Sequence, residues 1–337
     1  MEPPVSAHDL GLLTGKIRLL LAVRSDPACP NGDHSGQSGC GLLCSPPICA
    51  LPGYTGLHLR APMAAEGTEG IVSQFAGVYR EWAPRASLRE HVRCLWINDL
   101  RAARSSNLRV VPDGCVDIIW TGESLCVAGP DTEAILTELP CRSIVVGVRF
   151  HPGTAAAWLG QPVGEIVNTR VPLAAFWRHE APRLTDGAAA RGCGRQVAEG
   201  LEAFLAGRLA SVGSVDPGIA FLRRTAGDNR APAGLKLDQL AAHMGTSERT
   251  LRRRSLDVFG YGFKTLDRIL RFQRFFRLAA RAEKRDLATL AARAGYADQA
   301  HLSREVRRIS GITPGDFVVQ MQGSLADSFK TAFAGHM

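Results

Sequence analysis

Two closely similar stretches of six residues occur near the end of this chain, LAAHMG at 240–245 and LAARAG at 290–295. In both copies apolar residues stand at i, i+3, i+4 and i+7, a spacing that places them on one face of a short helix. Each predicted helix stops at a glycine, which suits the left-handed backbone of a sharp turn. The apolar positions are Leu237, Leu240, Ala241 and Met244 in the first copy, and Leu287, Leu290, Ala291 and Ala294 in the second.

A second helix is expected after each of these glycines, and the two second helices also correspond to each other. Their inward positions are offset by 51 residues rather than 50, because the second turn is one residue longer, and Gly260 and Gly311 close the two units. The pattern of short helix, glycine turn and second helix with a basic outer face is typical of helix-turn-helix units. The inward residues are Leu251, Ser255 and Val258 in the first unit, and Leu302, Val306 and Ile309 in the second.

The segment between the two units predicts one continuous connecting helix. GFKTLDRILRFQRFFRLAAR, at 262–281, allows about 18 helical residues, which at 1.5 Å per residue span roughly 27 Å. Consecutive major grooves on one side of B-DNA lie about 34 Å apart. We therefore expect a single chain to place both second helices in adjacent major grooves.

The distribution of charge supports a polyanionic partner. The whole chain carries a formal charge of +8, and residues 230–320 contain 18 Lys and Arg against 9 Asp and Glu, so this segment holds +9 and the rest sums to −1. Localised positive charge favours binding to nucleic acid, since each cation docked on a phosphate releases counterions. Ribosome-like or membrane-surface binding would give the same asymmetry.

Residues 235–320 resemble the DNA-binding domain of the AraC/XylS family of transcriptional regulators. The resemblance rests on LAAHMGTSERTLRRR in the first unit and on LAARAGYADQAHLSREVRRISGITPGDF in the second. It implies that residues on the outer faces of the second helices contact DNA. Arginine and glutamine can bond base edges in pairs, and other cations on the same faces position the protein on phosphates. The implied contacts to bases are Arg249, Thr250, Arg252, Arg253, Gln299, Ala300, His301, Ser303 and Arg304, and those to phosphates are Arg254, Lys264, Arg307 and Arg308.

The first unit departs from the family pattern at two positions. Ser255 stands where a large apolar residue is usual, and Phe263 stands where proline is usual. Losing a buried side chain of that kind would cost roughly 1.5 to 3 kcal/mol of burial, so we expect the first unit to be the looser one. Phe259 and Phe263 are the residues that could fill the gap.

The part of the chain before these units predicts a regulatory domain at 75–224, giving an α+β protein overall. Short apolar runs that end at Gly or Pro indicate strands in a barrel- or sandwich-like arrangement, followed by a helical extension from 154 to about 207. Residues 1–65 are rich in Gly, Pro and Cys and are expected to be disordered, or to precede a natural start at Met63. A linker at 225–234 and a tail at 321–337 complete the prediction.

The regulatory domain resembles the N-terminal regions of a subset of AraC-type proteins, through VVPDGCVDIIW, GVRFHPG and LGQPVGEIVNTRVPL. Effector binding, dimerisation or both are implied by this resemblance. His151 lacks partners at metal-ligand spacing, so a structural role is favoured, and Asp113 and Asp117 around Cys115 indicate a turn followed by a strand. The tryptophans Trp120, Trp158 and Trp177 are expected in the core, although aromatic walls also suit an apolar effector pocket.

The competing hypothesis is a DNA-targeted thiol or alkylation sensor, similar to Ada-type repair proteins. Cys29, Cys40, Cys44 and Cys49 lack a CxxC pair, which argues against a zinc-held cluster. A thiol switch among Cys94, Cys115, Cys126 and Cys141 is the other form of this hypothesis.

The sequence motifs of common enzyme classes are incomplete or absent. GLLTGKI lacks part of a phosphate-binding loop, and neither GxSxG nor HExxH occurs. No apolar run approaches the roughly 18 residues that cross a bilayer, so a cytoplasmic, nucleoid-associated location with reduced cysteines is expected.

Taken together, the sequence predicts a sequence-specific transcription regulator that is not an enzyme. The expected partners are operator DNA, RNA polymerase, a small-molecule effector and a second copy of the chain. No cofactor, metal or membrane is expected. A nonspecific nucleic-acid binder is the third possibility.

Overall fold

The computed structural model describes residues 71–72, 77–101, 107–138, 143–221, 238, 241–242, 244–281 and 286–320. The predicted extension at 1–65, linker at 225–234 and tail at 321–337 lie outside these residues. Strands occur between residues 71 and 172, and α-helices begin at Ala155 and predominate from Glu180 onward, as expected for an α+β protein.

A six-stranded antiparallel sheet forms the centre of the N-terminal half, which comprises the described residues from 71 to 221. Its order is β2–β3–β8–β5–β6–β9, and every neighbouring pair is antiparallel. The strands are β2 (Val78–Trp82), β3 (Val92–Asp99), β8 (Ile144–Phe150), β5 (Asp117–Trp120), β6 (Leu125–Ala128) and β9 (Arg170–Pro172). Four of the strands in this half lie in runs that the sequence predicted, each bounded by the expected Gly or Pro.

A smaller sheet packs near the first one. In it β4 (Asn107–Val110) pairs in parallel with β1 (Ile71–Val72) and antiparallel with β7 (Ile135–Glu138). Leu108 of β4 packs with Cys94 and Trp96 of β3 in one buried cluster. The two sheets therefore form the sandwich-like arrangement that the alternating runs predicted.

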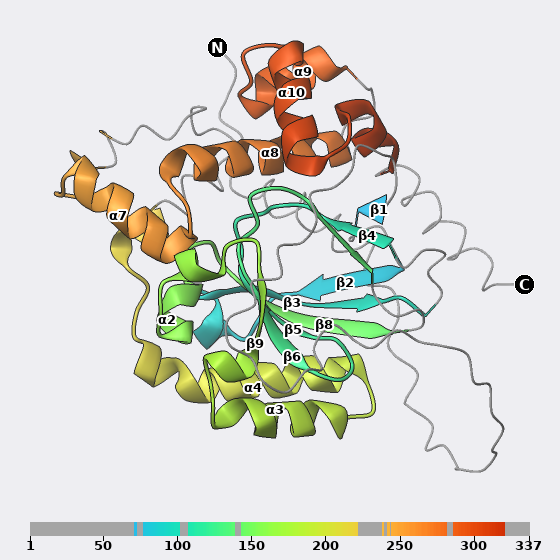
Figure 1. Cartoon of the computed structure of the whole chain (residues 1–337), viewed down its shortest axis with the longest axis vertical. Coiled ribbons are helices and arrows are strands. Elements are labelled where there is room, and N and C mark those ends of the chain that lie inside the picture. The colour runs from blue at the N-terminus through green and yellow to red at the C-terminus, as the bar shows by residue number, and fades with distance from the viewer. Residues whose placement is uncertain are drawn as a thin grey trace, which may run out of the picture. The chain divides into compact units, whose positions relative to one another are not determined.

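Helices cover the opposite face of the six-stranded sheet. They include α2 (Ala155–Leu159), α3 (Glu180–Ala189) and the longer α4 (Gly194–Val212), and Figure 1 shows α3 and α4 along this side. Alternate strand residues such as Ile118 and Val148 pack with Leu201 and Leu205 of α4. Trp120, Trp158 and Trp177 belong to the same cluster, which confirms that these tryptophans lie in the core.

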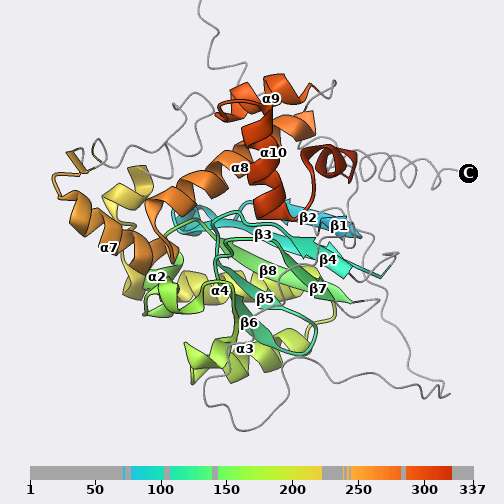
Figure 2. The ribbon, with the colours of Figure 1, turned by 45° about the horizontal axis from the view of Figure 1, so that its top comes forward.

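The C-terminal half contains the two helix-turn-helix units. Its helices are α7 (Glu248–Phe259), α8 (Phe263–Arg281), α9 (Leu287–Ala294) and α10 (Gln299–Ser310), and residues 314–320 are also helical. At 19 residues, α8 spans about 28 Å, close to the predicted length. In both views α8 lies between α7 and the pair of α9 and α10 (Figures 1 and 2).

The predicted glycine turns are present in both units. Gly245, Gly260, Gly295 and Gly311 all have positive φ, between 58° and 90°. One residue separates Gly245 from the N-cap of α7, whereas two separate Gly295 from the N-cap of α10. This difference is the extra residue that changes the repeat offset from 50 to 51.

The inner faces of both units are buried as the apolar spacing predicted. The residues of the second unit, Leu302, Val306 and Ile309, are fully buried, together with Leu290, Ala291 and Ala294 of α9. In the first unit Leu251 and Ala241 are buried, and Met244 and Val258 pack at the margin of the cluster. Leu237 and Leu240 lie outside the described residues.

The first unit accommodates Ser255 through a hydrogen bond and two aromatic rings. The Ser255 hydroxyl donates to the Tyr261 carbonyl oxygen at 2.6 Å. Phe259 and Phe263 are both buried in this unit, with ring centroids 6.4 Å apart. At the 51-residue offset, Ser255 and Phe259 correspond to Val306 and Ser310 of the second unit, so the small polar and larger apolar residues are exchanged between the two positions.

Candidate nucleic-acid interface

The exposed surface of α7 begins at its N-cap. The Ser247 hydroxyl accepts a hydrogen bond from the Thr250 backbone N–H at 3.2 Å, and this cap fixes the start of the helix. Thr250 itself is half-buried. The arginines that the sequence predicted to contact DNA are exposed along the helix: Arg249, Arg252, Arg253 and Arg254.

Two of these arginines form ion pairs at the surface. Arg252 contacts Glu248 one turn earlier at 3.1 Å, and Arg254 lies 3.8 Å from the Asp216 carboxylate. Exposed pairs of this kind contribute at most about 1 kcal/mol and are screened by salt. Both guanidinium groups could therefore exchange these partners for DNA phosphates at small cost.

The start of α10 is held by a carboxylate cap. Asp298 accepts a hydrogen bond from the His301 backbone N–H at 2.6 Å. The His301 ring is half-buried, accepts from the Ala297 backbone N–H at 3.3 Å through Nδ1, and contacts Tyr296 edge-on. His301 is thus anchored within the turn through Nδ1 and through its contact with Tyr296.

The remaining predicted residues of α10 are distributed over its outer face. The Ser303 hydroxyl donates to the Gln299 carbonyl oxygen at 2.9 Å, so this group is engaged within the helix. The exposed residues of this helix that were predicted to contact DNA are Gln299, Ala300, Arg304, Arg307 and Arg308.

Some arginines in this region are half-buried in ion pairs within the fold and do not lie on the outer surface. Arg268 of α8 pairs with Glu305 of α10 at 2.7 Å, and Arg271 pairs with Asp267 within α8. The Arg271 guanidinium also lies over the Tyr296 ring. These half-buried arginines connect α8 to the second unit, so the charge count alone overstates the cations that face solvent.

An aromatic cluster fixes the second unit on α8. Phe272 and Phe275 are fully buried, and both pack against Phe317, with ring centroids 5.6 and 6.0 Å apart. Because α9 and α10 share this core, the orientation of α10 depends on α8. The position of α10 is therefore fixed by a core that it shares with α8 and α9.

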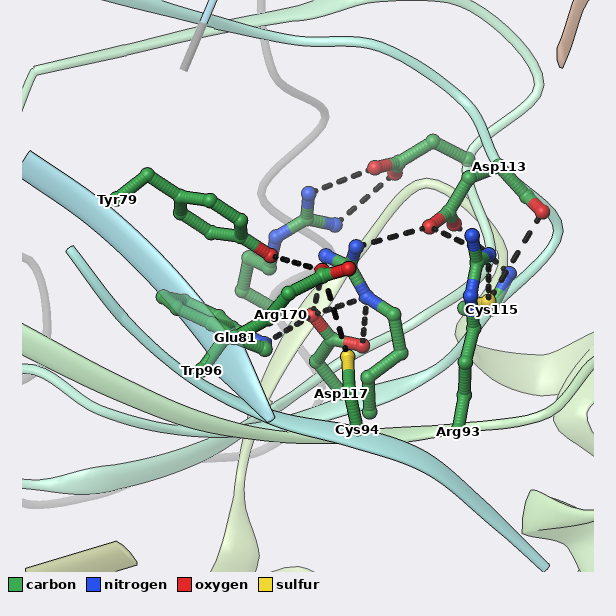
Figure 3. Close-up of polar contacts among 11 residues, drawn as sticks. Tyr79, Glu81, Arg93, Cys94, Trp96, Asp113, Cys115, Asp117 and Arg170 are labelled. Carbon is green, nitrogen blue, oxygen red and sulfur yellow. Dashed lines mark hydrogen bonds and ion pairs between the residues drawn. The ribbon is translucent and has the colours of Figure 1, made fainter. Parts of the chain in front are cut away.

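A buried ionic network in the N-terminal half was not predicted from the sequence (Figure 3). Asp113 accepts from the Cys115 backbone N–H at 2.9 Å, which is the predicted turn. However, Arg149 also lies 3.1 Å from Asp113 and bonds both oxygens of Asp117. The turn and the following strand are therefore joined by one arginine, a role that the local pattern did not indicate.

Neighbouring strands complete this network. Asp117 accepts from the Trp96 indole N–H at 3.1 Å. Trp96 faces Gly147 across the strands, where a Cβ atom would lie 2.2 Å from the indole, so only glycine leaves room for the ring. A second pair joins Arg170 of β9 to Asp131 at 2.7 Å. The network thus occupies the sheet face opposite the α4 core.

The aspartates of this network have shifted pKa values. Burial favours the neutral acid at Asp113, but Arg149 and Arg93 outweigh it, and the pKa of Asp113 is lowered. At Asp117 burial raises the pKa by more than Arg149 and Trp96 lower it. Burial likewise raises the pKa of Asp131 despite its pairing with Arg170. The folded state depends on Arg149 to compensate for two buried carboxylates.

The thiols of Cys94 and Cys115 are buried in the strand-rich part of the chain. The described residues contain no group of three or more His, Cys, Asp or Glu side chains that could hold a metal ion. Burial raises the pKa of Cys94 to about 12 and that of Cys115 well above its usual value, and a thiol without thiolate character is a poor sensor. Cys141 and the four cysteines between 29 and 49 lie outside the described residues.

The backbone of His151 connects two parts of the N-terminal half. Its N–H donates to the His91 carbonyl oxygen at 2.9 Å, and its own carbonyl accepts from Thr154. These contacts support the structural role that the sequence favoured.

Among the described helices, none is both long and apolar enough to span a bilayer.

Comparisons with protein families match two segments of the chain. Residues 240–320 match a family described as a helix-turn-helix domain, and residues 80–172 match a family described as a domain of unknown function. The comparison with curated proteins gave no match.

The similar solved structures include several of ToxT from Vibrio cholerae. ToxT from strain O395 is 12% identical, with a TM-score of 0.38 over 68% of this chain and 98% of that one. A 1.65 Å structure of ToxT is 14% identical, with a TM-score of 0.36 over 67% and 98%. ToxT from strain SCE256 with a bound unsaturated fatty acid is 12% identical, with a TM-score of 0.35 over 75% and 91%.

Proposed function

We propose, from the premise that residues 240–320 are a helix-turn-helix domain of the AraC type, that the chain is a sequence-specific transcription regulator. Its two recognition helices would be α7 and α10, placed in adjacent major grooves of one DNA duplex. The observation that carries the proposal is the pair of matched helices with exposed basic outer faces, separated by α8 of about 28 Å.

The roles of individual side chains follow from their position on each helix. In helix-turn-helix proteins the N-terminal residues of the recognition helix contact base edges. Arg253 and Arg304 are exposed and can each donate two hydrogen bonds to guanine. Arg307 and Arg308 lie in the last turn of α10 and would contact phosphates.

The N-terminal half would modulate this activity. Binding of an effector, contact with RNA polymerase and association of two chains remain proposals for this domain, as do the predicted domain boundaries. The action on chromosomal DNA would place the protein at the nucleoid. The thiol or alkylation sensor is the less favoured alternative, since the buried thiols Cys94 and Cys115 have raised pKa values.

Selection of bound DNA from a random pool tests the proposal directly. We expect the full chain to enrich one site made of two half-sites about one helical turn apart, because two recognition helices would bind one face of the duplex. Sequencing of the enriched pool measures the result. Enrichment of no preferred site would contradict the proposal and favour a nonspecific nucleic-acid binder.

Substitutions on α10 separate contacts to bases from contacts to phosphates. On the selected site, Arg304→Ala should cost about 1 to 3 kcal/mol of binding free energy and relax the preference at one position. Arg308→Ala should weaken binding to all sequences alike, and Arg253→Ala should act like Arg304→Ala in the other half-site. Binding to the site and to single-base variants measures this, and equal losses on every sequence for all three variants would rule out base recognition by Arg253 and Arg304.

A further inference from the structure

The N-terminal half contacts both helix-turn-helix units, in each case at the C-terminal end of the second helix of the unit. We define the second docking surface as Arg109, Val111, Pro112 and Ala134, which contact α8, α10 and the core of the second unit. We define the first docking surface as Gly153, Gly164 and Val167, which contact α7 and the residue that follows it.

The second docking surface binds the C-terminal end of α10. Arg109, which is completely buried, donates from Nη1 to the Ser310 carbonyl oxygen at 2.9 Å. The Ala134 backbone N–H donates to the Ile309 carbonyl oxygen at 2.7 Å. The last carbonyls of a helix have no partner within the helix, and a cation there also favours the helix dipole. These bonds therefore fix the end of α10 without using its outer face.

The same surface also contacts α8 near its middle. The Gln273 side-chain amide donates to the Pro112 carbonyl oxygen at 2.7 Å. Val111, between Pro112 and strand β4, packs against the apolar core of the second unit. The second unit is thus attached to the N-terminal half through both of its long helices.

The first docking surface approaches the C-terminal end of α7 very closely. A Cβ atom at Gly164 would lie 3.1 Å from the Leu256 carbonyl oxygen, and one at Gly153 would lie 2.7 Å from the Phe259 ring. The Val167 side chain lies closer still to Gly260, 2.5 Å from where a Cβ atom would stand. Here glycine permits backbone and side chains to pack without an intervening side chain.

A third contact lies at the junction of α7 and α8. The buried Tyr261 side chain ends 3.5 Å from where a Cβ atom of Gly114 would stand. Gly114 follows Asp113, which Arg149 holds at 3.1 Å. The buried ionic network therefore supports the turn on which this junction rests.

The two docking surfaces leave the N-terminal ends of both recognition helices exposed. Arg249 and Arg253 of α7 and Arg304 of α10 face solvent, whereas the C-terminal ends of the same helices contact the N-terminal half. Without these contacts the two units would be joined by α8 alone, and a single long helix bends. With them, both units are fixed on one sandwich.

From this arrangement we infer that the N-terminal half determines the allowed spacing between the two DNA half-sites, with Arg109, Gln273 and Gly164 as positioning residues. The inference rests on the proposed function. It assigns to the N-terminal half a direct part in DNA specificity, through the distance and angle between α7 and α10.

The test measures affinity of the full chain for duplexes with altered spacing. The selected site is compared with sites in which one base pair is inserted between the half-sites, and with duplexes that hold one half-site only. One base pair moves the second half-site by about 3.4 Å and turns it by about 35°, so the wild type should bind the altered site at least about tenfold more weakly. For Gly164→Ala and Gln273→Leu we expect this ratio to fall below about threefold, with single half-site binding unchanged.

Matched controls separate positioning from general damage. Gly192→Ala changes an exposed glycine with nothing within 4 Å, and Arg101→Met removes an exposed ion pair with Asp99, so both should keep the wild-type ratio. Arg109→Met should widen the spacing tolerance further. If Arg109→Met does not fold because its site is buried, the Gly164→Ala and Gln273→Leu variants alone test the inference.

The outcomes distinguish this inference from the proposed function. A wild type with a sharp spacing preference, shared by folded Gly164→Ala and Gln273→Leu, would overturn the inference and leave the proposed function standing. Equal weakening on single half-sites and on paired sites would also overturn it, since that result indicates structural damage. A wild type that selects no paired site would remove the proposed function itself.

Discussion

Replacing Arg149 with methionine is expected to destabilise the folded chain by about 3 to 5 kcal/mol at pH 7. Arg149 is the shared cation of Asp113 and Asp117, at 3.1 and 2.8 Å, and all three side chains are largely buried. Methionine keeps most of the volume but leaves two buried carboxylates uncompensated. Urea unfolding monitored by tryptophan fluorescence would measure the loss.

The size of this loss should decrease as the pH falls. In the wild type Arg149 helps to lower the pKa of Asp113, so that part of the stability is present above the unfolded pKa and is lost as the pH falls. In the variant burial still favours the neutral acids while Arg149 is lost, so we expect the folded pKa of both aspartates to rise above the wild-type values and both groups to take up protons more readily as the pH falls. The difference between wild type and variant should therefore be smaller at pH 5 than at pH 7.

Two further variants control for packing and for surface charge. Arg149→Met combined with Asp113→Asn and Asp117→Asn removes the buried charges together and should recover most of the lost stability. Arg101→Met, which breaks an exposed pair with Asp99, should cost less than about 1 kcal/mol. A loss of that small size for Arg149→Met alone would show that the network does not stabilise the fold.

Affinity for the selected DNA site is expected to fall about 10³-fold between 50 and 200 mM salt. This estimate assumes about six phosphate contacts, each of which releases counterions on binding. The exposed basic side chains of the two units are numerous enough to supply them. They are Arg249, Arg252, Arg253, Arg254, Lys264, Arg293, Arg304, Arg307 and Arg308. Fluorescence anisotropy at a series of salt concentrations gives the slope of log affinity against log salt.

Single substitutions locate this charge effect. Arg308→Ala should reduce the slope by about 1, whereas Arg195→Ala, on an exposed face of α4, should leave it unchanged. A shallow slope for the wild type, or an equal change for both variants, would place the DNA on another surface.

The helix-turn-helix units could be predicted from the sequence because their determinants are local. The i, i+3, i+4 and i+7 spacing identified the buried faces, and the positive φ of Gly295 and Gly311 is what the end of a helix requires. The sequence also showed that Ser255 stands where a large apolar residue is usual, and Phe259 and Phe263, which were expected to fill the space, are buried in the same unit.

The docking surfaces and the ionic network had no local signal. Arg109 and Ser310 are 201 residues apart, and a charged residue in a strand has the same pattern whether it faces solvent or a buried partner. Asp113 and Asp117 therefore indicated only a turn and a strand, because nothing near them in sequence marks Arg149 as their partner.

By itself the sequence determined that this chain has two matched helix-turn-helix units joined by one helix, with basic residues on the outer faces of their second helices. Only the tertiary structure decided that both units are attached to the strand-rich half through the C-terminal ends of α7 and α10. The physical reason is that helical periodicity is set by neighbours within a few residues, whereas the partner of a helix end or of a buried charge depends on which surfaces the whole chain brings together.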